Sequence, residues 1–393
     1  MLVPPERVDH SEEHFPETCN GCGRSLRGVQ PEPEPWRHQV AELPEIRAQI
    51  TEHRCHRVCC PRCNTITVAP LPAGVASGDF GPRLRAFVAL LVGRFRLSRR
   101  EVVELCREAF DLTISVGGVV RVLSRVSEAL AGPVRALTRK VRRVRVVFLD
   151  DTTWWLKRAR RALWVVCTKW DSLYQVASGR TKKAVRALLG AKFRGIGIGD
   201  RAKANGEIPA ERRQVCWCHL QRNFKGLADR GGRCAWLGEW GVDVAARLFH
   251  HWGAYKRGEI TRRAMQRRMG HLEAEVEELL EWGCQHGDGK ARRFCEELWK
   301  VRPSLFLFAR VDGVEPTSNR PERDLRPAVL WRKGCFGSQS DGGLLFVGRI
   351  LSATRSCRRR AIPLLAYLTE VCRAQDERRP VPLWWRWRAR DGT

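Results

Sequence analysis

The chain has 393 residues, of which 43% are hydrophobic, and its 71 lysines and arginines exceed its 43 aspartates and glutamates by 28. This length and apolar content predict two or three folded domains with a sizeable core, which excludes an intrinsically disordered chain. Because so large a positive excess favours a polyanionic partner, nucleic acid is the expected partner, with a merely soluble basic protein as the alternative.

The chain contains 16 cysteines, many of them inside apolar runs, where cysteine acts as a small hydrophobic residue. Its first residues, Met1 to Arg7, lack the basic and apolar regions of a signal peptide. No apolar run reaches the roughly 18 residues that span a bilayer. We therefore expect a protein of the reducing cytoplasm that associates with nucleic acid and not with membranes, with metal binding where cysteine spacing supports it.

Two cysteine pairs predict a small zinc-binding domain over residues 19–69, after a disordered segment at 1–18. The pairs are Cys19-Asn-Gly-Cys22 and Cys60-Pro-Arg-Cys63, with 37 residues between them. Each pair can give two thiolates to one tetrahedral Zn²⁺, which would stabilise a lobe too small for a core. Other candidates for the fourth ligand are His53, Cys55, His56 and Cys59. The alternative is an irregular lobe of reduced thiols.

The apolar spacing of residues 80–135 predicts a helical region, which follows a linker at 70–79. Leu84, Phe87, Val88 and Leu91 have helical spacing, and Ser98-Arg-Arg-Glu101 is a capping box that begins a second helix. Ser115 can cap a third helix with one apolar face (Val116, Val119, Val120 and Leu123) and a basic one (Arg121 and Arg125). Helix, short turn and helix with exposed arginines resembles a helix-turn-helix DNA reader, and plain helix packing is the alternative.

Residues 140–227 predict the first part of a catalytic domain. A buried strand over 144–151 ends in Asp150 and Asp151, and a hairpin of two strands follows at 162–168 and 173–177. A helix at 183–189, a strand at 195–200 ending in Asp200, and a strand at 214–219 that runs into a helix complete it. The order β-β-β-α-β-α-β-α is that of a ribonuclease-H-like domain.

The remaining segments predict an all-α insertion at 228–310, a helical C-terminal part of the catalytic domain at 311–376, and a basic aromatic tail at 377–393. The expected fold class is therefore multidomain α+β. Glu322 lies in Asn319-Arg-Pro-Glu-Arg-Asp-Leu-Arg-Pro327, where a proline precedes a helix-prone run.

The carboxylates Asp150, Asp200 and Glu322 have the chemistry to hold a pair of divalent cations for phosphodiester cleavage, since hard cations prefer carboxylate oxygens. Caps and loop formers are the alternative, because aspartates at strand ends often have those roles. Asp150 is the preferred ligand and Asp151 the fallback, because side chains alternate along a strand and the two should point in different directions.

Three sequence blocks in register resemble those of DDE transposases of the insertion sequence family sixty-six. They are Phe148-Leu-Asp-Asp-Thr-Thr-Trp154, Val215-Cys-Trp-Cys-His-Leu-Gln-Arg-Asn-Phe224 and Gly313 to Pro327. The paired cysteine knuckles and the Gly81-Pro-Arg-Leu and Leu97-Ser98 motifs also fit this family. Three positions depart from its pattern: Asp151 replaces a glutamate, Thr153 a glycine and Ser318 an asparagine.

The resemblance implies a transposase that cuts at the ends of its element and joins the freed 3′-hydroxyl to target DNA. Its catalytic triad would be Asp150, Asp200 and Glu322 with two Mg²⁺ or Mn²⁺ ions. His219, which follows Cys216 in the family's C-x-x-H element, would contact the phosphate or hold a carboxylate; otherwise it caps its helix.

Arg323 and Arg326 would meet DNA phosphates, or else be solvated or paired with Asp324. The expected partners are double-stranded DNA at the element's ends and at the target, a second copy of the chain bound to DNA, and accessory proteins of the element. The alternatives are a decayed copy that only binds DNA and a ribonuclease-H-like nuclease that cuts without joining.

Overall fold

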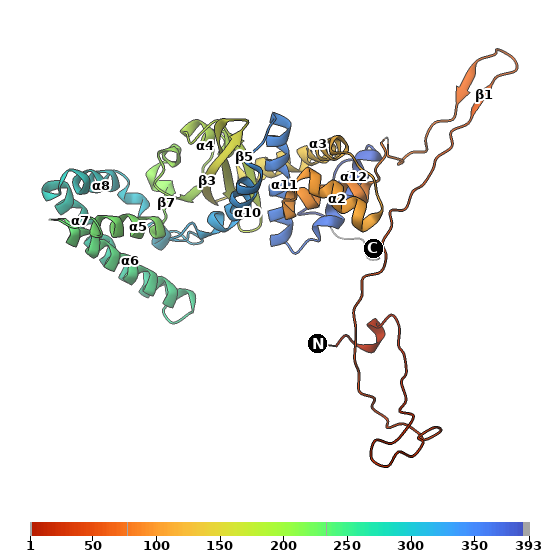
Figure 1. Ribbon diagram of the computed structural model, residues 1–393. Coiled ribbons are helices and arrows are strands. Elements are labelled where there is room, and N and C mark those ends of the chain that lie inside the picture. The colour runs from red at the N-terminus through yellow and green to blue at the C-terminus, as the bar shows by residue number, and fades with distance from the viewer. Residues whose placement is uncertain (1, 77, 233, 388–393) are drawn as a thin grey trace.

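The computed structural model describes residues 2–76, 78–232 and 234–387 (Figure 1). Its centre is a five-stranded sheet in the order β5-β4-β3-β6-β7, covered and flanked by helices. Apolar side chains from the sheet and the helices form its core. The structure is thus a mixed α/β fold.

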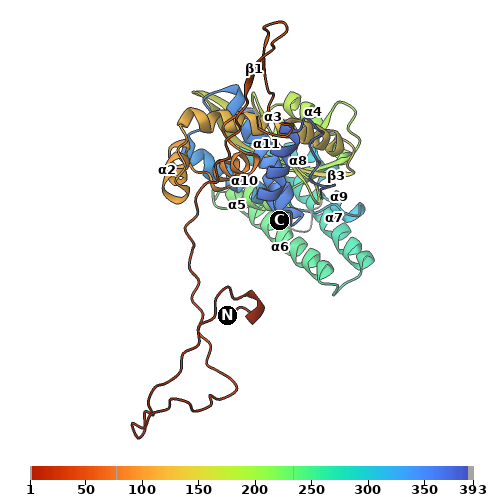
Figure 2. The same cartoon turned by 90° about the vertical axis from the view of Figure 1, so that its right-hand side faces the viewer.

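Residues 2–75 lead away from this body in both views (Figures 1 and 2). The regular structure of the segment is a 3₁₀ turn at Pro5–Arg7, an isolated antiparallel bridge between Thr18 and Ser25, and a hairpin of β1 (Arg57–Cys59) and β2 (Ile66–Val68). None of the described residues before Arg85 is buried. This part of the chain therefore has no apolar core of its own.

The predicted helical region forms three helices: α1 (Pro82–Leu90), extended by a π-helical turn at Leu91–Phe95, α2 (Arg99–Phe110) and α3 (Val116–Val141). The capping box of Ser98 and Glu101 is present, and Ser115 caps α3 through the amide of Gly118, 3.0 Å away. The buried face of α3 includes Val119 and Leu123, but Val116 and Val120 are exposed. The four residues do lie on one side of the helix, as expected, but the buried side is centred on Val119, Val122 and Val126, so Val116 and Val120 lie at its edge and stay exposed.

The sheet begins with three antiparallel strands, β3 (Val146–Leu156), β4 (Ala159–Cys167) and β5 (Ser172–Ala177). After α4 (Lys182–Leu189), capped by Thr181, the strands β6 (Ile196–Gly199) and β7 (Arg213–Val215) pair in parallel with β3 and with each other. The turns between β6 and β7 are 3₁₀ turns, at Lys203–Glu207 and Ala210–Arg212, where an α-helix was expected. The connection between β6 and β7 has 13 residues, 200–212, and the two turns fill most of it, so the parallel strands are joined without an α-helix.

Three helices follow in the C-terminal part of the chain: α10 (Asn319–Cys335) and α11 (Asp341–Arg359) pack against the sheet, and α12 (Leu364–Asp376) packs against α1 and α3. The edge strand β5 has amide groups that no neighbouring strand can bind. Ser356 accepts from the amide of Ser172 at 3.1 Å, and Ser352 accepts from that of Tyr174 at 2.9 Å. Serines of α11 therefore satisfy the edge of the sheet, which prevents pairing with another chain.

Only helices occur between β7 and α10 in the part of the chain that the structure describes: α5 (Trp217–Ala228), α6 (Ala235–Lys256), α7 (Arg262–His286), α8 (Gly289–Trp299) and α9 (Leu307–Arg310), with a 3₁₀ turn at Arg302–Ser304. Figure 1 shows α6, α7 and α8 together on the side of the sheet opposite α3. Within the described ranges, no helix is both long enough and apolar enough to cross a bilayer.

The chain after α12 returns to the body of the protein. Trp384 is fully buried, and its indole nitrogen donates to Asp171 at 3.1 Å. Residues 388–393 of the segment predicted to be a basic aromatic tail lie outside the described residues.

Candidate active site

Strand pairing brings Asp150 and Asp200 to the same place in the sheet. Phe148 of β3 is the parallel partner of Ile198 of β6, so continuing this register by two residues places the two aspartates side by side. The strand β6 stops at Gly199, whereas β3 continues to Leu156 along β4. The expectation that the first strand ends at the acids was wrong, because its partner β4 extends the pairing. Only β6, the parallel neighbour of β3, ends beside the acids.

The two consecutive acids of β3 have different partners. Asp151 is paired with Arg180 and is 9% exposed. Asp150 has no salt bridge within the described residues and accepts the amide of Asp151 at 2.8 Å. Burial, partly opposed by this hydrogen bond and reinforced by the Asp200 carboxylate, raises the pKa of Asp150 to about 7. The carboxylate free to bind a cation is therefore that of Asp150.

Asp200 is held by its own loop. Its Oδ1 accepts from the amide of Ala202 at 3.0 Å and from Nδ2 of Asn205 at 2.8 Å. A side chain at Gly199 would meet Nδ2 of Asn205 at 3.0 Å and the carbonyl oxygen of Leu149 at 3.1 Å, so only glycine allows this close approach. The role of Asn205 was missed in the sequence because it depends on the fold of the 3₁₀ turn.

His219 lies in the first turn of α5 with its charge close to both aspartates. Its Nδ1 is buried without a hydrogen-bond partner in the described structure. Interaction with the thiol of Cys216 raises the pKa of His219. Cys216 itself accepts from the amide of Ser318 at 3.2 Å, which connects the start of α5 to the start of α10. One ring nitrogen of His219 is therefore not bound by any protein group in the described structure.

Glu322 lies in the first turn of α10 and lines the same cleft as Asp150. The cleft has a volume of about 750 Å³, and Arg323 and Arg326 also line it. Glu322 and both arginines are exposed. Helix α10 therefore adds one acid and two cations to the cleft beside the aspartates of the sheet.

Asp324, on the opposite face of α10, is the residue that ties this helix to the sheet. It is 1% exposed and binds Arg355 and Arg359 of α11, each at 2.7 Å, and also the hydroxyl of Ser172. Burial alone would raise the pKa of Asp324, but Arg359, Ser172 and Arg355 together hold it below its usual value. The suggested pairing of Asp324 with Arg323 or Arg326 is not formed; the arginines that bind it come from a helix that no sequence pattern linked to α10.

Neither the predicted divalent-cation site nor the predicted zinc site has all its ligands grouped together in the described structure. Within the described residues, no three His, Cys, Asp or Glu side chains are grouped closely enough to hold a metal ion. Cys19 interacts with Cys22, and Cys63 with Cys60. The hairpin of β1, next to the second pair, and the N-terminal part of the chain extend in opposite directions in Figure 1. Each pair fits half of a zinc site, and the four-cysteine site is not formed.

The other predicted DNA-binding residues lie on α3. Arg121 is exposed beside the exposed Val120, whereas Arg125 is half-buried and its carbonyl accepts from Gln375 at 3.3 Å. They belong to a different surface from Arg323 and Arg326. The structure does not test whether either pair binds DNA.

Comparison with known proteins agrees with the sequence blocks described above. No curated protein matches the chain. The sequence profile described as "Transposase IS66 family" matches residues 78–345, which is more than half of the chain and contains all the acids of the cleft but not the cysteine pairs. The chain therefore belongs to the IS66 family of transposases.

Proposed function

We propose that this chain binds the ends of its element and catalyses metal-dependent DNA cleavage and strand transfer at the cleft between β3 and α10, next to the end of β6. The proposal places the catalytic acids at Asp150, Asp200 and Glu322 in a ribonuclease-H-like domain. The element order from β3 to β6, with an acid on the first strand and another after the strand that follows the first helix, supports that fold. The observation that carries the proposal is the juxtaposition of Asp150 and Asp200, neither of which forms a salt bridge within the described residues.

The donor set of the cleft fits a divalent cation. Two carboxylates side by side repel each other, and this repulsion contributes to the high pKa of Asp150. A bound Mg²⁺ or Mn²⁺ would relieve the repulsion and, as a Lewis acid, supply an activated oxygen nucleophile. Asp150 and Asp200 would be the first ligands, and Glu322, exposed at the start of α10, lies on the wall of the same cleft. Asp151 remains in its salt bridge with Arg180 and does not compete with Asp150 for the cation.

The remaining residues of the cleft have the chemistry to orient DNA. Arg323 and Arg326 present guanidinium groups that can bind phosphate oxygens in pairs. His219 offers a buried nitrogen that has no partner in the described structure, suitable for holding a phosphate oxygen or a carboxylate. Asp324 is a positioning residue, because its ion pairs with Arg355 and Arg359 fix the turn of α10 that carries Glu322.

The region before the sheet is proposed to bind DNA as well. A helix-turn-helix-like unit of α2 and α3, with Arg121 and Arg125, would recognise the terminal repeats, and a zinc lobe over 19–69 would form if the two cysteine pairs meet on one ion. The all-α segment at 228–310 would be an insertion in the catalytic domain. We also propose that two copies of the chain assemble on DNA and that accessory proteins of the element take part.

Strand cleavage and joining assays separate this proposal from its rivals. The substrate is a labelled duplex that carries the element's end, with Mg²⁺ or Mn²⁺. A decayed copy would bind the duplex and give no product, and a nuclease would give cut strands but no joined ones. Asp150→Asn should abolish both products and leave binding intact.

A further inference from the structure

The tip of the β3–β4 hairpin is an exposed cluster of positive charge at the far end of the strand that carries Asp150. Its sequence is Lys157-Arg158-Ala159-Arg160-Arg161. All of these residues except Arg161 are exposed. None of the four cations has an acidic side chain within salt-bridge distance in the described structure, whereas Arg355 and Arg359, for example, both bind Asp324. Arg160 donates to the hydroxyl of Thr153 at 3.4 Å. An exposed charge run can simply be solvated, so further observations must decide.

The backbone of the tip has one residue in a strained conformation and is held in place by hydrogen bonds from the loop after α10. Leu156 pairs with Ala159, which leaves a two-residue turn, and Lys157 occupies the left-handed region with φ 55°. Glycine or asparagine normally takes such a position in a hairpin, and a side chain there costs about 1 kcal/mol or more. The turn is also fixed, because the amide of Lys157 donates to Ser338 at 2.7 Å and the amide of Ser338 donates to Trp155 at 2.8 Å. Because a lysine occupies this strained, immobilised turn where glycine would fit without strain, its charge has a candidate role in binding an anion.

The hairpin and α10 run side by side away from the cleft. Arg332 donates to the hydroxyl of Thr152 at 3.0 Å, Trp331 contacts Trp154 with ring centroids 6.0 Å apart, and Ser338 forms a parallel bridge with Leu156. The first turn of α10 therefore lies beside Asp150 and the residues just after α10 lie beside the tip. Along α10, Arg323, Arg326 and Lys333 share one exposed stripe with helical spacing.

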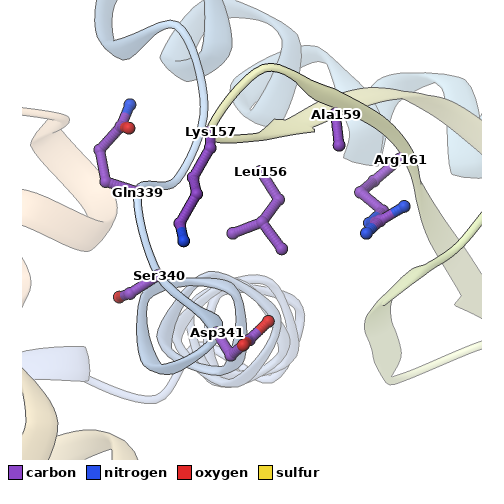
Figure 3. A pocket seen from close by; sticks show the side chains of 7 residues that line it. All are labelled: Leu156, Lys157, Ala159, Arg161, Gln339, Ser340 and Asp341. Carbon is purple, nitrogen blue, oxygen red and sulfur yellow. The ribbon is translucent and has the colours of Figure 1, made fainter.

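A pocket of about 400 Å³ separates the hairpin from the start of α11 (Figure 3). Lys157 points from the turn toward Ser340, and Arg161 lies on the other side of Leu156. The pocket also contains one acid, Asp341. Two cations and the polar groups of Gln339 and Ser340 thus surround an opening at the end of the basic stripe.

We propose that the hairpin tip and the stripe of α10 form a track for the DNA backbone, with the tip holding the duplex about seven base pairs from the phosphate that lies over Asp150. The distance follows from the strand: seven residues from Asp150 to Lys157, at about 3.3 Å each, span roughly 23 Å. Successive phosphates of one strand are about 3.4 Å apart along the duplex axis. This inference rests on the proposed function, because it takes the acids as the point of cleavage.

The test compares two double variants that remove the same charge. Arg158→Ala with Arg160→Ala changes the tip and leaves Lys157 in its turn. Lys192→Ala with Arg194→Ala is the control, because both residues are exposed in the loop that enters β6, at the end of the sheet opposite Asp200. Binding of a labelled duplex of mixed sequence is measured over a series of salt concentrations, and unchanged thermal unfolding of both variants shows that they fold.

The tip variant should lower the slope of log affinity against log salt by about 1.8, since each lost phosphate contact removes about 0.9, and should weaken binding roughly tenfold or more at physiological salt. The control should change neither quantity to that extent. A tip variant with the slope and affinity of the control would overturn the inference.

A second readout tests the spacing and keeps the inference separate from the proposed function. A photocrosslinking residue at position 158 should react with DNA about seven base pairs from the cleaved bond. Crosslinks at the cleaved bond itself, or none, would contradict the track. If the wild-type protein cleaves DNA while the tip variant binds like the control, only the track fails. If the wild type shows a flat salt response, the proposed function fails with it.

Discussion

The Asp150→Asn substitution tests the electrostatic account of the cleft without any assay of activity. Asparagine has nearly the shape of aspartate and its oxygen can still accept the amide of Asp151, which Asp150 accepts at 2.8 Å. It removes the charge that burial and Asp200 disfavour. We therefore expect Asp150→Asn to abolish DNA cleavage and yet to make the protein more stable at pH 8.

The expected size follows from the pKa of Asp150, which rises from 3.8 to about 7. Each pKa unit corresponds to about 1.4 kcal/mol, so the charged form costs the folded state up to about 4 kcal/mol. Between pH 4 and pH 7 the folded carboxyl keeps a proton that the unfolded one releases, so the wild type loses stability as pH rises through this window. Above pH 7 the full cost is present, and near pH 4 both proteins should be alike.

The assay is urea unfolding of both proteins at pH 4.5 and pH 8, with and without Mg²⁺. The advantage of the variant should be present at pH 8 and small at pH 4.5, and Mg²⁺ should stabilise only the wild type at pH 8, because ligand binding to the folded state adds stability. Asp229→Asn, an exposed acid at the end of α5, is the matched control and should change stability by less than about 0.5 kcal/mol. A variant that is equally stable or less stable than the wild type at pH 8 would refute the reasoning.

Three further predictions concern other parts of the chain. Asp324→Asn leaves Arg355 and Arg359 without their carboxylate and should lower the free energy of unfolding by about 3–5 kcal/mol, measured by urea unfolding; a loss below about 1 kcal/mol would contradict its positioning role. Lys157→Gly should be about 1 kcal/mol more stable than Lys157→Ala in thermal unfolding, because both lose the same charge but only glycine relieves the left-handed backbone; equal stability would show that the turn is not strained. Zinc bound per chain should fall in Cys19→Ser and Cys60→Ser but not in Cys106→Ser, which changes a buried cysteine of α2; zinc that survives the first two substitutions would rule out the four-cysteine site.

The local elements of this fold were predictable because their signals are local. The capping box at Ser98, the cap at Ser115, and the hairpin of β4 and β5 all agree with the structure. Each depends on residues a few positions apart, and hydrogen bonds within the segment decide them.

The boundaries that depend on neighbouring segments were not predictable in the same way. Thr152 to Trp155 favour an extended strand as much as the residues before Asp150 do, so no signal in the chain marks where β6 stops beside β3. The hub at Asp324 joins residues more than 150 positions apart, from Ser172 to Arg355, and the loop hydrogen bonds of Asn205 depend on the turn that it occupies. Sequence motifs therefore located the acids, and the structure was needed to find what holds them.

The most direct test of the central claim is strand cleavage and joining on a labelled duplex carrying the element's end, with Mg²⁺ or Mn²⁺. Wild type is compared with Asp150→Asn and Glu322→Gln, and with Asp229→Asn as a control of equal charge change. We predict metal-dependent cut and joined products that the first two substitutions abolish while DNA binding persists, and that the control retains. Products that survive Asp150→Asn and Glu322→Gln would show that the catalytic acids lie elsewhere.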